Sequence, residues 1–105
     1  MDEFKGIVRI RYNDKVIGFK FGTMQTALFC KTMNCKLSEL DKVLDGSDIE
    51  AQLNWFWTAS VAYSRLFKTD EISIDELSAI IDSYGFSNLE QDAAASVVIP
   101  KEEAQ

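Results

Sequence analysis

Histidine is absent from this sequence of 105 residues, so catalytic sites that rely on an imidazole base cannot be built from it. Acid–base chemistry would have to rest on a pair of carboxylates. Neighbouring carboxylates occur at Asp70 and Glu71 and again at Asp75 and Glu76, but both pairs lie beside serines at an expected helix start. Helix capping explains the carboxylates at that place. We therefore predict no catalytic residues and expect that the protein is not an enzyme.

The two cysteines, Cys30 and Cys35, are the remaining candidates for site chemistry. They lie five positions apart, with neither a second pair nor a histidine to complete the ligands of a zinc site. The five glycines are scattered, so no phosphate-binding loop is expected. The first residues, MDEFKGIV, lack the basic and apolar regions of a secretory signal. We expect a reducing cytoplasm, two free thiols and no metal or other cofactor.

Charge is unevenly distributed along the chain, whose net charge is −6. Residues 1–36 contain seven basic and three acidic residues, a balance of +4, whereas residues 37–105 contain four and fourteen, a balance of −10. An acidic protein is repelled by phosphate backbones, so we expect no nucleic-acid binding. The basic first third is either a solvated face or a surface that contacts an acidic partner or the acidic body of a second copy.

The elements that must position any functional side chain begin with a β-hairpin over residues 6–21. Apolar and polar residues alternate on both sides of Asn13 and Asp14, two residues that tolerate left-handed backbone angles. This two-residue loop sets Ile10 opposite Ile17 and places the apolar side chains on one side of the ribbon. An isolated hairpin is barely stable in water, so its apolar face must pack on the helices that follow.

Four helices are expected after the hairpin, at about 24–33, 38–44, 48–68 and 74–84. Thr23 and Ser38 are the expected caps of the first two, and Ser47 or Asp48 of the third. Ser73 and Glu76 form a capping box at the start of the fourth. Residues 1–86 then form a single domain of class α+β, with the hairpin packed on a small helical bundle. Ser87 and Glu90 could start another short helix, but Pro100 and the polar ending KEEAQ favour a weakly structured tail over 87–105.

The third helix is unusually apolar, because residues 51–64 contain no charge and Trp55-Phe56-Trp57 point in successive directions around it. A membrane span is excluded, since the uncharged stretch is shorter than a bilayer requires and contains Gln52, Asn54 and other polar residues. The helix can be a central core helix, or it can keep one face for a partner or a second copy, and both interpretations can hold together. The predicted partner-binding residues, which combine core and contact roles, are Trp55, Trp57, Tyr63 and Phe67.

The order of these segments resembles the tail assembly chaperones of long-tailed bacteriophages and prophages. The resemblance covers roughly residues 6–86. A basic hairpin precedes Phe21-Gly22-Thr23, and Leu-x-Glu-Leu at 37–40 precedes NWFWTASVAYSRL at 54–66 and ISIDELSAIID at 72–82. The resemblance implies a protein of the host cytoplasm that covers the tape-measure protein before tail-tube subunits polymerise around it, and that is absent from the finished particle. It implies no catalytic residues, and the family's binding residues are not defined by a motif.

Two other functions remain open. One is a structural tail component, such as a terminator or connector, which would persist in purified particles. The other is an acidic regulator or inhibitor that binds a basic partner, which the balance of −10 over residues 37–105 favours. In every case the expected partner is another polypeptide, with neither nucleic acid nor membrane involved, and a homo-oligomer is possible.

Overall fold

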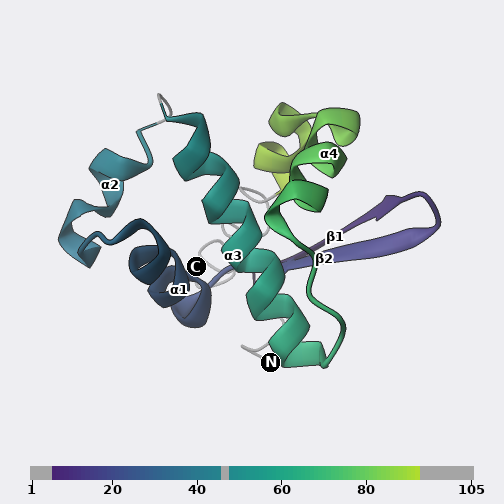
Figure 1. Ribbon diagram of the computed structural model, residues 1–105, viewed down its shortest axis with the longest axis horizontal. Helices are drawn as coiled ribbons and strands as arrows, with labels where there is room; N and C mark the ends of the chain where they lie inside the picture. Colours follow the sequence, from purple (N-terminus) through teal and green to yellow (C-terminus); the bar gives the residue numbers. More distant parts are fainter. Residues whose placement is uncertain (1–5, 46–47, 93–105) are drawn as a thin grey trace, which may run out of the picture.

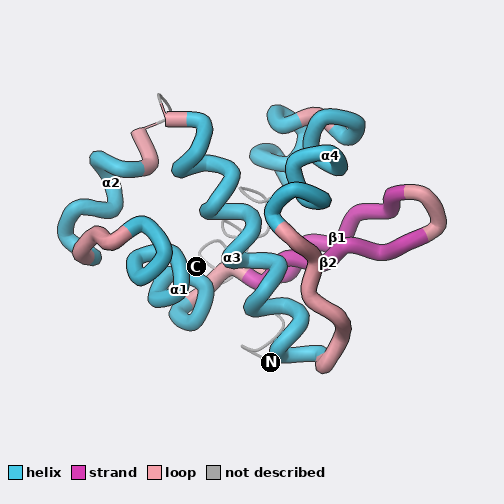
Figure 2. The backbone as a smooth tube through the Cα atoms, viewed as in Figure 1, coloured by secondary structure: helices cyan, strands magenta, loops and turns pink. Residues whose placement is uncertain are grey.

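An antiparallel β-hairpin lies against the longest of several helices in the computed structural model, which describes residues 6–45 and 48–92 (Figure 1). The elements, in chain order, are β1 (Ile7–Tyr12), β2 (Lys15–Lys20), α1 (Thr23–Met33), the 3₁₀ helix η2 (Leu37–Glu39), α2 (Leu40–Val43), α3 (Ile49–Phe67) and α4 (Ile74–Tyr84). Helix α3 runs through the middle, with α1 and α2 on one side and α4 and the hairpin on the other (Figure 2). The predicted α+β class, a hairpin packed on a small helical bundle, is confirmed.

The hairpin has the predicted turn and the predicted register. Asn13 and Asp14 both have left-handed backbones, with φ angles of 49° and 66°, as a type I′ turn requires. Ile10 pairs with Ile17, and the next inward pair toward the open end is Val8 with Phe19. These four side chains are buried. Turn chemistry and hydrophobic alternation specify the same register, which is why this part of the fold could be predicted in detail.

Helix α1 ends as predicted, but it begins differently. Asn34 adopts the left-handed conformation that ends many helices, and its N–H and that of Cys35 donate to carbonyls of the last turn. At the start, Gly22 occupies the N-cap position instead of Thr23. The Thr26 hydroxyl donates to the Gly22 carbonyl oxygen at 2.8 Å. The predicted helix at 38–44 is divided into η2 and α2, and neither has a fully buried residue.

Helix α3 is the spine of the molecule, and Asp48 is its cap. The Asp48 carboxylate accepts hydrogen bonds from the backbone N–H groups of Glu50 at 3.0 Å and Ala51 at 3.3 Å. At mid-helix the Phe56 ring makes edge-on contacts with rings of the hairpin and of the segment after α4, at centroid distances of 6.2 Å to Phe19 and 5.6 Å to Phe86. A single core therefore joins the hairpin, α3 and α4.

Ser73 caps helix α4, and its hydroxyl accepts the Glu76 N–H at 3.0 Å. The predicted capping box is only half formed, since the Glu76 carboxylate lies 3.4 Å from Lys15 Nζ of the hairpin. After Gly85 the chain becomes helical again over residues 86–92. Leu89 in this segment is 0% exposed and belongs to the core. The Tyr84 hydroxyl donates to Asp92 Oδ2 at 2.6 Å, a bond that raises the pKa of Tyr84.

The prediction of a weakly structured tail from residue 87 is therefore wrong for residues 87–92. The core extends past the boundary expected at residue 86, because Leu89 fills a position in it. The rest of the predicted tail, residues 93–105, lies outside the described residues. Among the described helices, none combines the length and apolar character needed to cross a bilayer.

Candidate functional site

The four predicted partner-binding residues do not form one patch. All four lie on α3 and are half-buried, but Trp55 and Trp57 point in directions about 200° apart on the helix. Tyr63 and Phe67, one turn apart, form a third direction with their rings in contact at 4.6 Å between centroids. The structure therefore joins Tyr63 with Phe67 and separates both from the two indoles.

Trp55 belongs mainly to the core. Its ring meets Phe29 of α1 edge-on at 5.1 Å between centroids and lies 6.3 Å from Phe21, next to the end of β2. The buried Gln25 side chain donates to the Trp55 carbonyl oxygen at 3.1 Å. Because residues of α1 and of the hairpin surround Trp55, this residue holds α1 against α3. Only part of its ring remains available to a partner.

Trp57 faces a groove between α1 and the chain that leads into α4. The indole N–H donates to the Ile72 carbonyl oxygen at 3.0 Å. The groove has a volume of about 360 Å³ and mixes apolar and charged side chains. Its lining consists of Leu28, Lys31, Thr32, Trp57, Thr58, Val61, Arg65 and Glu71. The Trp57 indole therefore lines the groove, and its N–H group anchors the chain that connects α3 with α4.

Tyr63 and Phe67 hold an arginine of the hairpin. The Arg9 Nε donates to the Tyr63 hydroxyl at 2.9 Å, and its guanidinium carbon lies 5.4 Å from the Tyr63 ring centroid and 5.3 Å from that of Phe67. The Tyr63 ring lies directly over Gly18, the cross-strand partner of Arg9. A pairing of Arg9 with aromatic residues of α3 joins positions more than fifty residues apart, so sequence reasoning missed it.

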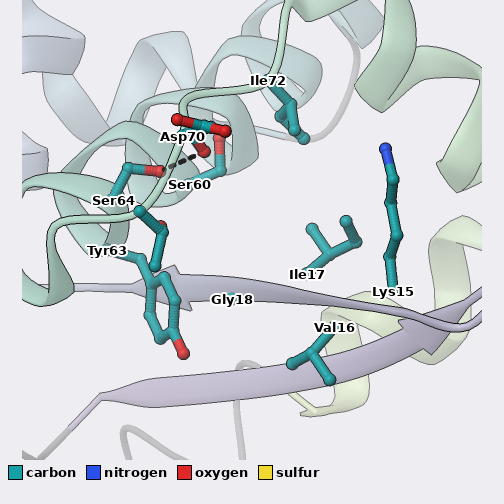
Figure 3. A pocket seen from close by; sticks show the side chains of 10 residues that line it. Lys15, Val16, Ile17, Gly18, Ser60, Tyr63, Ser64, Asp70 and Ile72 are labelled. Carbon is teal, nitrogen blue, oxygen red and sulfur yellow. Dashed lines mark hydrogen bonds between the residues drawn. The ribbon is translucent and has the colours of Figure 1, made fainter.

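A pocket of about 370 Å³ opens beside β2, between that strand, α3 and the chain leading to α4 (Figure 3). Its two serine hydroxyls are already engaged with the backbone. Ser64 Oγ donates to the Asp70 carbonyl oxygen at 3.2 Å, and Ser60 Oγ donates to the Trp57 carbonyl oxygen at 2.7 Å. Each serine therefore donates its proton to a carbonyl oxygen and not to a basic side chain. The lining residues are Lys15, Val16, Ile17, Gly18, Ser60, Tyr63, Ser64, Thr69, Asp70 and Ile72.

The most apolar of these three depressions lies between the start of α3 and the end of α4. This apical groove has a volume of about 280 Å³ and is lined by Ile49, Leu53, Ser78, Ile81, Asp82, Gly85 and Phe86. Ile49 is 68% exposed, although it is a large aliphatic residue in the first turn of a helix. Sequence reasoning missed this groove, although an isoleucine directly after the capping aspartate was a usable signal.

The two cysteines lie together at the end of α1. The Cys35 N–H donates to the Cys30 carbonyl oxygen at 3.0 Å, and both thiols are free. Burial raises the pKa of the Cys35 thiol, and a hydrogen bond with Cys30 raises it further, so Cys35 is mostly protonated and weakly nucleophilic at neutral pH. Within residues 6–45 and 48–92, no group of three or more acidic or cysteine side chains is placed to hold a metal ion.

Comparisons of the chain with models of protein families, with curated proteins and with solved structures found no match. The surfaces that remain as candidate binding sites are the apolar apical groove and the face of the hairpin that holds the exposed Arg9 and Arg11.

Proposed function

We propose that the chain is a tail assembly chaperone of a long-tailed bacteriophage or prophage. It would bind the tape-measure protein in the host cytoplasm before the tail tube polymerises. The order of segments over residues 6–86 supports the choice of family, and the surface of the helical half supports the mode of binding.

The observation that carries the proposal is the apical groove with Ile49 at its mouth. Ile49 is 68% exposed, the half-buried Leu53 lines the same groove, and the buried Ile81 lies at its floor. Tape-measure proteins are long and largely helical, so they expose apolar stripes before assembly. A groove between two helices accepts such a stripe, because apolar side chains spaced by one helical turn can enter it together. Each large side chain buried in this way contributes about 1.5–3 kcal/mol before the costs of association.

Two further apolar side chains are exposed elsewhere on the helical half of the molecule, outside the apical groove. Leu37 of η2 and Met24 of α1 are both exposed, and α2 contributes no fully buried residue. A methionine and a short, lightly packed helix can adjust to stripes of different sequence. Loose specificity suits a chaperone that must cover many segments of one long partner.

The test is co-expression with the tape-measure protein of the same phage or prophage genome, followed by a solubility assay and a pull-down. Ile49→Lys should leave helicity and the melting temperature unchanged, because the side chain is exposed, but it should abolish capture and return the partner to the insoluble fraction. Leu66→Lys is the matched control, because Leu66 lies on the same helix, is 40% exposed and is outside the groove. It should capture the partner as the unmodified chain does.

One result would argue against the groove, and two would argue for other functions. Equal capture by Ile49→Lys and the unmodified chain removes the groove from the interaction. Detection of the chain in purified particles by mass spectrometry identifies a structural tail component instead. A complex that dissociates when salt is raised well above physiological strength is typical of an acidic inhibitor held by charge.

A further inference from the structure

The outer edge of β1 presents backbone groups that pair with no other described strand. The two-residue turn makes Tyr12 and Lys15 the first pair after the loop, and in such a hairpin this pair is joined by hydrogen bonds. Hydrogen-bonded pairs then recur at every second position. The Phe21 N–H donates to the Gly6 carbonyl oxygen at 2.9 Å, which agrees with this alternation. The N–H and C=O groups of Ile7, Arg9 and Arg11 therefore point away from β2.

β1 is the open edge of the hairpin. On the β2 side, the Tyr63 ring covers Gly18, and α3 packs along the strand. Figure 3 shows β2 between β1 and the pocket formed by α3 and the chain leading to α4. Within the described residues, the sheet contains β1 and β2 alone, so no described strand pairs with the other side of β1.

Two arginines of β1 lie on one face of the hairpin beside this open edge. Arg9 and Arg11 are both exposed and lie on the same face of β1, two positions apart. Arg9 is already ordered by Tyr63 and Phe67, which reduces the entropy lost when it binds a carboxylate. No described residue pairs with Arg11. Two copies joined edge to edge through β1 would bring these arginines close to their equivalents, and like charges on neighbouring strands repel.

We propose that β1 binds an extended acidic segment of another polypeptide as a third strand of the sheet. The outward N–H and C=O groups of Ile7, Arg9 and Arg11 would pair with the backbone of that segment. Carboxylates at alternate positions of the segment would face Arg9 and Arg11. This interaction is independent of the apical groove, and its failure would leave the proposed chaperone function untouched.

The probe is a labelled peptide of sequence VEVEVEV, titrated into the ¹⁵N-labelled protein at low salt. We expect saturable binding, shifts at the amides of Ile7, Arg9 and Arg11, and slower hydrogen exchange at these three amides. The amides of Val8 and Ile10 already donate to β2 and should change little. The peptide with lysine in place of glutamate should not bind, and neither should the acidic peptide with alternate amides N-methylated, which keeps its charge but loses its outward donors.

Two substitutions at one position separate charge from backbone pairing. Arg11→Ala should weaken binding about threefold, the size of one cross-strand charge pair. Arg11→Pro also removes an N–H that points outward, so the hairpin keeps its own hydrogen bonds while peptide binding falls about fivefold further. Unchanged far-UV circular dichroism and unchanged shifts of β2 amides establish that the hairpin is intact in both variants.

Several results would overturn the proposal. They are the absence of saturable binding, equal binding of the N-methylated peptide, or peptide-induced shifts that avoid β1. Equal affinities of Arg11→Ala and Arg11→Pro with an intact hairpin would show that charge alone holds the peptide. A dimer in analytical ultracentrifugation that Arg11→Pro abolishes would show that a second copy, and not a foreign segment, occupies the edge.

Discussion

Gly18 must be glycine because of its contact with Tyr63, a residue far away in the sequence. Its position inside β2 is unusual, because glycine weakens a strand unless a bulge or a close approach requires it. The reason is the Tyr63 ring, since a Cβ atom on Gly18 would lie 2.3 Å from Cζ of that ring. The flat contact lets the Tyr63 hydroxyl reach Arg9 on the neighbouring strand. Gly18 therefore allows α3 to overlap the edge of the hairpin.

Gly18→Ala should destabilise the protein by about 1–3 kcal/mol in urea unfolding, because the methyl group overlaps the Tyr63 ring and forces it aside. The control is the same substitution in a Tyr63→Ala background, where the overlap is gone and the alanine should have an effect near zero. A Gly18→Ala cost that persists in that background would mean that the strand backbone, and not the ring, requires glycine.

At the scale of elements, the hairpin and α2 differ in how strongly local sequence and packing specify them. The hairpin is specified locally, since a type I′ turn and alternating side chains agree on one register. Helix α2 has four residues and none of them is buried, so neither propensity nor packing holds it strongly. An element held in this weak way is suited to adjusting around a partner, whereas the hairpin is suited to presenting a fixed edge.

Asp14→Gly should stabilise the protein by about 0.5–1 kcal/mol. Asp14 has a φ angle of 66°, and Asn-Gly is the favoured pair for a type I′ turn because glycine adopts this angle without strain. Asp14→Ala should be destabilising by a similar amount, since alanine lacks the local hydrogen bonding that helps aspartate tolerate the conformation. Thermal unfolding followed by circular dichroism measures both. If the two variants have the same melting temperature, the turn does not limit stability.

At the scale of the whole molecule, one aromatic centre connects parts of the chain that are far apart in sequence. Phe56 contacts rings at Phe19, Phe21 and Phe86, so the hairpin, α3 and the segment after α4 share it. Only Phe56, of the three successive rings at 55–57, is fully buried. The two indoles on either side stay half-buried, which leaves apolar surface near the core without weakening it.

Phe56→Ala should cost about 3–5 kcal/mol, a large part of the stability of a domain of this size. Because the core is shared, helix loss by far-UV circular dichroism and exposure of the indoles by fluorescence should shift together to lower urea concentrations. Leu66→Ala, at an exposed position of the same helix, should cost less than about 1 kcal/mol. Separate transitions for the two signals would show that the hairpin and the helices do not share one core.

Much of this fold could be predicted from the sequence because it depends on neighbours along the chain. Turn residues, alternation and capping side chains determined the hairpin register, the bounds of α3 to within a residue and those of α4. Ser73, and Asp48 as one of two expected caps of α3, act within three residues of their own positions, so these roles could be predicted from the sequence. The uncharged stretch of α3 likewise predicted a helix that the rest of the molecule would surround.

Only the tertiary structure decided which faces of that helix are covered and which stay open. It separated Trp55 from Trp57, placed Tyr63 on Gly18, buried Leu89 and left Ile49 at the mouth of a groove. The physical reason is that these contacts join residues far apart in sequence. Their formation depends on how helices pack and on the volume between them, and neither is contained in any local pattern of residues.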